Sequence, residues 1–369
     1  MVTLASPIVA GSSVTLPQPR GPITEQLFAS LSQRAHQLAW TVTAADLEDD
    51  DDLHLALYCC YELHYLGLPA VDPDWEWEPS LLAVRRQLED HFLAELEAMT
   101  ESVAIGADAE SVIPRLWEMA TNGAGPSLSG WVAQRASLSQ LRELAVHRSA
   151  YQLKEADPHT WGIPRLADDA KAAMVAIQAD EYGNGVTASM HATLFARTMT
   201  ALGLVPIMNF YLDQIPGVTL ATTNLITMLG LHRRWRGALV GHLALFEMTS
   251  IGPMARYAQA HRRLGVPESG CEFYDVHVSA DQIHQHLAAD GMVAGLLAHE
   301  PHLARDVIFG AACLGVVEAR FSSYILGQWR VNRTSLRPTK ASSELRVPVL
   351  CRSETACATA RHETNRLAG

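Results

Sequence analysis

Apolar residues recur along most of the chain at the three- and four-residue spacing of an amphipathic helix. We find no convincing run in which apolar and polar residues alternate, as they do in a half-buried strand. In the N-terminal third, the pattern predicts helices over residues 23–40, 53–66, 79–100 and 109–121. Farther along it predicts helices near residues 135–155, 166–182, 187–203, 218–229, 232–251, 272–288 and 303–328. The sequence therefore predicts an all-α fold.

The stretch TNGAGPSLSG, residues 121–130, has the glycine, serine and proline content of a connection between two parts of a fold. We therefore expect a helical N-terminal extension over 23–130 and a helical bundle over 131–332. Residues 1–22 lack a charged segment followed by an apolar one, which predicts a flexible leader and not a signal peptide. Residues 333–369 become polar and contain prolines, which predicts a disordered tail.

The composition is that of an ordinary globular protein, with 369 residues of which 48% are hydrophobic and 18% charged. The net charge of −12 argues against nucleic acid or an anionic membrane surface as a partner. We also find no apolar run of the roughly 18 residues that a membrane span needs. None of the six cysteines forms a C-x-x-C pair. This argues against a disulfide framework or a structural zinc site and predicts a cytoplasmic protein.

The stretch HVSADQIH places His277, Asp281 and His284 on one face of a helix, within about 60° of one another. Apolar residues lie beside this triplet at Val276, Ala280, Ile283 and Leu287. We therefore expect the triplet to point into the bundle, where an unpaired carboxylate is unfavourable. A metal ion would satisfy all three groups, and two histidines with one carboxylate suit Fe(II) with open coordination positions.

In helical bundles, facing helices supply the remaining metal ligands. Glu247 lies in the apolar helix GHLALFEMTS, where an unpaired buried carboxylate would cost several kcal/mol or become protonated. Glu181 and His191 flank a glycine-rich turn that can bring both side chains to one end of the bundle. Glu155 ends a helix before a proline-containing loop; taken alone, it would fit an ordinary surface carboxylate. Together with HVSADQIH, these residues give four carboxylates and three imidazoles, enough to hold two metal ions.

In this order, Glu155, EYGNGVTASMH (from Glu181 to His191), Glu247 and HVSADQIH resemble the haem-oxygenase-like di-iron oxidases and oxygenases, a family of iron-containing redox enzymes. The flanking stretches KEADPHTWGIP and FYDVHVSADQIH are similar to that family as well, and the resemblance covers roughly residues 50–330. It implies a haem-oxygenase-like helical bundle that binds no haem. It also implies two Fe(II)/Fe(III) ions, with O2 as co-substrate.

The resemblance also implies roles for the seven residues. It assigns Glu155, His191, Asp281 and His284 to one iron or to bridging positions. It assigns Glu247 and His277 to the second iron. Glu181 resembles the extra carboxylate of the N-oxygenating members, which favours oxygenation of an amine or guanidine nitrogen.

We accordingly expect a di-iron oxidase or oxygenase that acts on a small amine, an amino acid or an aliphatic acid. We find no flavin or nicotinamide site, so electrons would come from an external reductant, and a reductase is the expected partner. The N-terminal helices would cover the bundle or form the interface of a homodimer.

Three alternatives fit the same sequence. The chemistry could be desaturation or C–C cleavage instead of N-oxygenation. The enzyme could be metal-free and haem-oxygenase-like, which requires a catalytic cysteine or a basic substrate pocket. Cys271 lies at a helix start, which can lower a thiol pKa, but its surroundings fit a small buried apolar residue better. Finally, the polar residues could form a structural network in a helical protein without enzymatic activity.

Overall fold

The computed structural model describes residues 16–339, apart from residue 49, residues 105–106 and residue 124. Within that part of the chain every regular element is a helix, which confirms the predicted all-α class. The described residues up to Arg337 form one structural unit. The domain boundaries predicted near residues 130 and 332 stay predictions.

The first helices of the chain are α1 (Pro22–Leu31), α2 (Asp50–Glu62), α3 (Pro79–Ala104), α4 (Val112–Asn122), α5 (Leu128–Arg135), α6 (Leu138–Gln152) and α7 (Asp157–Thr160). They are followed by α8 (Asp168–Glu181), α9 (His191–Ala201), α10 (Gly217–Leu231), α11 (Arg236–Arg263) and α12 (Glu272–His286). A π-helical segment, η9 (Leu287–Val293), leads into α13 (Ala294–His299), and α14 (Ala304–Arg330) ends the bundle. Short 3-10 turns connect several of these helices.

Among the predicted helices, two differ most in length from the structure. Helix α1 ends at Leu31, whereas the pattern extended it to residue 40. Helix α11 continues to Arg263 although Pro253 lies inside it, whereas the prediction ended at residue 251. A proline normally breaks a helix interior. Helix α11 packs along both α12 and α14, and this tertiary packing outweighs the local penalty.

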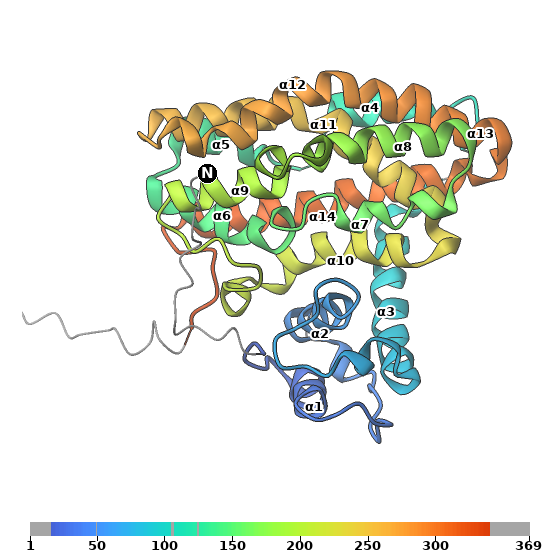
Figure 1. Cartoon of the computed structure of the whole chain (residues 1–369), viewed down its shortest axis with the longest axis vertical. Helices are drawn as coiled ribbons and strands as arrows, with labels where there is room; N and C mark the ends of the chain where they lie inside the picture. Colours follow the sequence, from blue (N-terminus) through green and yellow to red (C-terminus); the bar gives the residue numbers. More distant parts are fainter. Residues whose placement is uncertain (1–15, 49, 105–106, 124, 340–369) are drawn as a thin grey trace, which may run out of the picture. The chain divides into compact units, whose positions relative to one another are not determined.

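Helices α11 and α14 form the centre of the bundle, with α12 packed along α11 and α8 along η9 (Figure 1). Two glycines allow the central pair to come together. A Cβ atom at Gly241 would overlap the backbone carbonyl of Val307, and one at Gly310 would overlap that of Ala238. The close approach therefore requires glycine at both positions. It fixes α11, which carries Glu247, against a rigid neighbour.

The stretch Pro301–Arg330, which contains α14, is long and apolar enough by composition to cross a membrane, which the sequence analysis did not find. In the structure, 56% of the most apolar window is buried inside the unit. Its contacts with α11, α10 and α3 are those of a central helix in a bundle.

The ends of the predicted leader and tail pack where the structure describes them. Arg20 donates hydrogen bonds to the carbonyl oxygens of Leu212 and Ile215, at 2.8 and 2.7 Å. Ser335 is completely buried and its hydroxyl donates to Glu143 Oε2 at 2.7 Å. Hydrogen bonds therefore hold these two positions in place. Residues 1–15 of the predicted leader and residues 340–369 of the predicted tail lie outside the described residues.

Candidate metal centre

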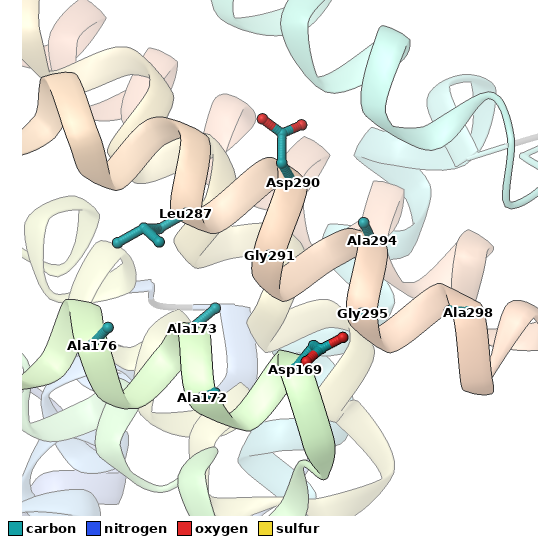
Figure 2. Close-up of a pocket in the computed structure, with 10 residues that line it drawn as sticks. All are labelled: Asp169, Ala172, Ala173, Ala176, Leu287, Asp290, Gly291, Ala294, Gly295 and Ala298. Atoms are coloured by element: carbon teal, nitrogen blue, oxygen red, sulfur yellow. The ribbon is translucent and has the colours of Figure 1, made fainter.

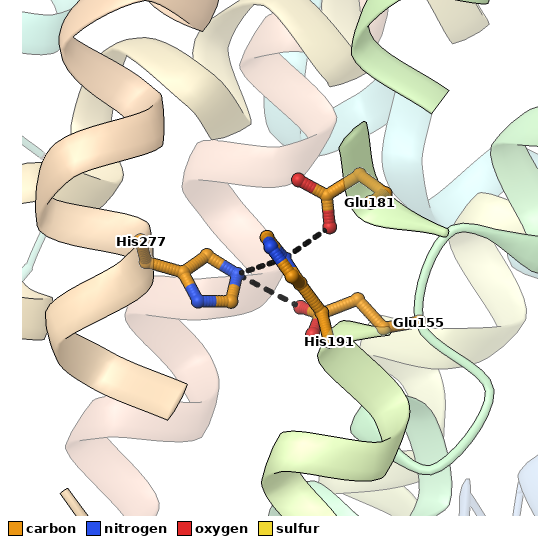
Figure 3. A group of neighbouring side chains, drawn as sticks. All are labelled: Glu155, Glu181, His191 and His277. Carbon is orange, nitrogen blue, oxygen red and sulfur yellow. Dashed lines mark hydrogen bonds and ion pairs between the residues drawn. The ribbon is translucent and has the colours of Figure 1, made fainter. Parts of the chain in front are cut away.

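Four of the selected side chains form a first cluster, drawn in Figure 3. His191 Nδ1 lies 2.7 Å from Glu181 Oε2 and 3.1 Å from His277 Nε2. His277 Nε2 in turn lies 3.7 Å from Glu155 Oε1. The four residues come from four places in the chain, because Glu155 follows α6, Glu181 ends α8, His191 begins α9 and His277 lies in α12.

A second cluster adjoins the first and consists of Glu181, Glu247, Asp281 and His284. His284 Nδ1 lies 3.3 Å from Glu247 Oε2, 3.5 Å from Asp281 Oδ1 and 3.6 Å from Glu181 Oε1. Within each cluster, one ligand atom from every residue lies within 4.8 Å of the others. Glu181 belongs to both clusters, one carboxylate oxygen in each, which is the geometry of a bridging carboxylate.

The structure therefore brings all seven sequence-selected residues together, but it groups them differently from the family resemblance. His277 lies with Glu155 and His191, and Glu247 lies with Asp281 and His284. The seven-residue spacing between the two histidines explains the difference. They are about two turns apart along α12, so each reaches a different cluster.

All seven residues are buried, and the most exposed whole residue is Glu181 at 6%. Several of their polar atoms nevertheless make no hydrogen bond within the described part of the chain: Glu155 Oε1 and Oε2, Glu181 Oε1, Asp281 Oδ1 and His284 Nδ1. Buried polar atoms are normally hydrogen-bonded, and an unpaired buried charge is costly. Cations placed in the two clusters would satisfy these atoms together, and carboxylate with imidazole is a donor set that iron accepts.

In the metal-free protein, the side chains of the two clusters offset one another's charges through their protonation states. Burial acts to lower the pKa values of His277 and His284, but nearby carboxylates raise them, to about 10 and about 11. Burial raises the pKa of Glu247 to about 8. Burial also acts to raise the pKa of Glu181, but His191 and His277 lower it, to about 2. The imidazoles of His277 and His284 are therefore protonated beside carboxylates, and metal binding has to displace those protons.

Helix α12 exposes the residues that the sequence analysis placed beside its buried face. Ile283 is 64% exposed, and Val276 and Ala280 are only partly buried. The triplet His277, Asp281 and His284 points inward, as predicted, and shares the buried face of α12 with Phe273 and Tyr274. Burial of the three polar groups is favourable only if they find partners.

A small cavity of about 10 Å3 lies between the clusters, with room for about one water-sized molecule. Its walls include Tyr151, Leu243 and Phe246 next to the cluster carboxylates. His159 and Gln178 also line it, although neither was selected from the sequence. Gln178 lies one turn before Glu181 on α8, and that spacing was the signal available for it.

Two larger hollows lie along the surface where α8 faces the α12–η9 segment. One, of about 560 Å3, is lined by small residues of α8 and of η9 and α13, as Figure 2 shows. The other, of about 730 Å3, is lined by Asp180 of α8, by the start of α12 and by the turn before it. Neither is lined by a residue of the two clusters.

Comparison with known proteins gives two findings. A sequence model of the iron-containing redox enzymes matches residues 142–315, the stretch that contains all seven cluster residues. Over 159 residues the chain is 24% identical to a nitrosourea synthase of Streptomyces achromogenes subsp. streptozoticus, a match that takes in 43% of this chain. The matched part covers 34% of that protein, so the chain spans about a third of this relative. With the all-helical architecture, the family match confirms the predicted haem-oxygenase-like fold class.

Proposed function

We propose, from the match of residues 142–315 to the iron-containing redox enzymes, that the chain is a non-haem di-iron oxidase or oxygenase. The observation that carries the proposal is the pair of adjoining buried clusters that share Glu181, together with their unpaired carboxylate oxygens. One ion would be held by Glu155, Glu181, His191 and His277. The second would be held by Glu181, Glu247, Asp281 and His284.

The iron ions would supply the binding and reduction of O2, chemistry that amino-acid side chains do not perform. The protein's own residues have three tasks. The carboxylates balance the metal charge. The small cavity between Tyr151 and Phe246 has room for a molecule about the size of O2 or water. The buried walls keep bulk water out.

We favour a small amine or amino acid as the substrate, oxygenated on nitrogen, with an aliphatic acid as the other candidate. The matched relative is a nitrosourea synthase, and a nitrosourea carries oxygen bound to nitrogen. The reductant is external, with a reductase as the proposed partner, and the proposed setting is a cytoplasmic homodimer. Desaturation and C–C cleavage are the other reaction outcomes that a product analysis would detect.

The test is to load the metal-free protein anaerobically with Fe(II), count the bound iron and mix the complex with O2 in a stopped-flow spectrometer. We expect about two irons per chain and a transient visible absorption band. His284→Ala should lose both the second iron and the band. Failure of the wild-type protein to bind iron would overturn the proposal and favour a metal-free enzyme or a structural network.

A further inference from the structure

The two ring nitrogens of His284 have different partners. Nδ1 faces the second cluster, whereas Nε2 lies 3.1 Å from Oδ2 of Asp180, a residue that belongs to neither cluster. An ionised carboxylate can only accept a hydrogen bond, so Nε2 carries the proton and donates. Because Nε2 keeps its proton, the proton that metal binding displaces is the one on Nδ1, and its loss frees the Nδ1 lone pair for the cluster.

His277, two turns earlier on α12, is oriented by a different kind of partner. Its Nδ1 donates to the backbone carbonyl of Phe273 at 2.7 Å, and its Nε2 points to the first cluster. The two histidines therefore present opposite nitrogens to their clusters. For His277 the outer partner is backbone and no substitution removes it, whereas for His284 it is a single side chain.

Asp180 is itself held in place by the turn that follows α8. Its Oδ1 accepts a hydrogen bond from Asn184 Nδ2 at 2.9 Å. Asn184 has a φ of 51°, a left-handed conformation that asparagine tolerates better than most residues. The chain of contacts thus runs from the GNG turn through Asn184 and Asp180 to His284.

Asp180 also differs from the cluster carboxylates in exposure. Its side chain is 43% exposed, compared with 7% for Glu181, its neighbour in sequence. It lines the 730 Å3 hollow between α8 and α12, so it stands at the border between solvent and the buried site. A substitution there leaves no large buried gap.

We infer that Asp180 is a positioning residue, which holds the Nε2 proton of His284 and so directs Nδ1 to the second metal position. The inference rests on the proposed function, because it concerns the metal affinity of that site. Carboxylates that orient a metal-bound histidine typically change metal affinity 10- to 100-fold when they are removed. Asp180 is the residue of this chain that the contacts assign to that task.

The experiment compares Asp180→Ala, Asp180→Asn and Glu272→Gln in anaerobic Fe(II) titrations of the full-length protein. Glu272 is the matched control, because it lines the same hollow but pairs with Arg197 and belongs to neither cluster. We expect Asp180→Ala to weaken the second iron roughly 10- to 100-fold and Asp180→Asn, which keeps an acceptor oxygen, to weaken it less. Glu272→Gln should stay within about twofold of the wild-type affinity, and the unfolding midpoints of the metal-free proteins should agree closely.

A spectroscopic measurement separates positioning from a general structural role. In the Co(II)-loaded protein, the Nε2 proton of His284 should give a shifted NMR resonance that exchanges with D2O, and this exchange should become faster in Asp180→Ala. Wild-type affinity and exchange in Asp180→Ala, or an equal loss in Glu272→Gln, would overturn the inference. These outcomes differ from failure of the proposed function, in which the wild-type protein itself binds no pair of irons.

Discussion

Lys154 and Glu155 are neighbours in the sequence and both are buried, yet their charged groups meet opposite surroundings. The Lys154 ammonium pairs with Glu62 of α2 and lies 4.7 and 4.5 Å from the ring centres of Tyr58 and Tyr65. Both carboxylate oxygens of Glu155, by contrast, lack a hydrogen-bond partner in the described part of the chain.

The charged groups around Lys154 are paired with other protein groups. The second oxygen of Glu62 accepts from Asn209 Nδ2 at 2.9 Å, and Asn209 Oδ1 accepts from the Tyr58 hydroxyl at 2.7 Å. Here protein groups pair with the ammonium and with both carboxylate oxygens of Glu62, and they connect α2 to the bundle. The difference teaches that burial of charge does not by itself indicate a metal site. The informative feature at Glu155 is the absence of enough protein partners within the described residues.

The largest expected change in stability comes from removing the ammonium group of Lys154. Lys154→Ala should lower the free energy of unfolding by about 3–5 kcal/mol, because it leaves Glu62 buried without its cation. Urea unfolding of the metal-free protein measures this. The double variant Glu62→Gln/Lys154→Met should recover part of the loss, and a single-variant loss below about 1 kcal/mol would contradict the account.

The open clusters predict the next effect, stabilisation by metal. Fe(II) at about 100 times its dissociation constant should raise the free energy of unfolding by about 2.7 kcal/mol per site. Thermal unfolding under anaerobic conditions, with and without Fe(II), measures the shift. Glu155→Gln should lose much of it and the Glu62→Gln/Lys154→Met variant should keep it. An equal shift in all three proteins would show that the iron binds elsewhere.

The third effect is a dependence of stability on pH, caused by a buried histidine with a hydrogen-bond partner at each ring nitrogen. His147 contacts the hydroxyl oxygens of Thr219 and Ser335 at 2.8 and 3.0 Å. Burial and the nearby Arg148 charge lower its pKa to about 3. Between pH 3 and 6.5 the unfolded chain therefore binds a proton that the folded chain does not. The stability contribution of neutral His147 is complete above about pH 6.5 and is lost as the pH falls.

At pH 5 the loss from this one group should be roughly 2 kcal/mol, at about 1.36 kcal/mol for each pKa unit. His147→Asn should therefore lose about that much less stability than the wild-type protein between pH 7 and pH 5. Urea unfolding of both metal-free proteins at the two pH values provides the comparison. Identical losses would mean that His147 is not held neutral in the folded state.

The smallest effect is predicted for Glu155 in the absence of metal. Glu155→Gln keeps the shape and removes a buried acid whose pKa is raised mainly by burial. We expect the free energy of unfolding of the metal-free protein to change by less than about 1 kcal/mol, or to rise. A large destabilisation, measured by the same urea titration, would show that the Glu155 carboxylate stabilises the metal-free fold, as the Lys154 ammonium does.

The sequence predicted the parts of the molecule that depend on local spacing. Helical periodicity predicted the all-α class, and the spacing of HVSADQIH placed two histidines and an aspartate on the buried face of α12. Glu181 and His191 lie together as expected, because a short turn connects their helices.

The features that the sequence did not predict depend on contacts between distant segments. The pairing of Lys154 with Glu62 spans 92 positions, and the contact of Asp180 with His284 spans 104. Neither has a spacing signal. Ile283 was expected to be buried because apolar side chains usually are, but on α12 the buried face is taken by the polar triplet. The division of the seven residues into clusters likewise depends on how far apart along α12 the two histidines lie.

The most direct test of the central claim is a crystal structure of the anaerobically iron-loaded protein, with anomalous diffraction recorded at the iron absorption edge. The account predicts two anomalous peaks, one among Glu155, His191 and His277 and the other among Glu247, Asp281 and His284, with the Glu181 carboxylate between them. Peaks at other positions, or fewer than two peaks under full loading, would contradict a di-iron site built from these seven residues.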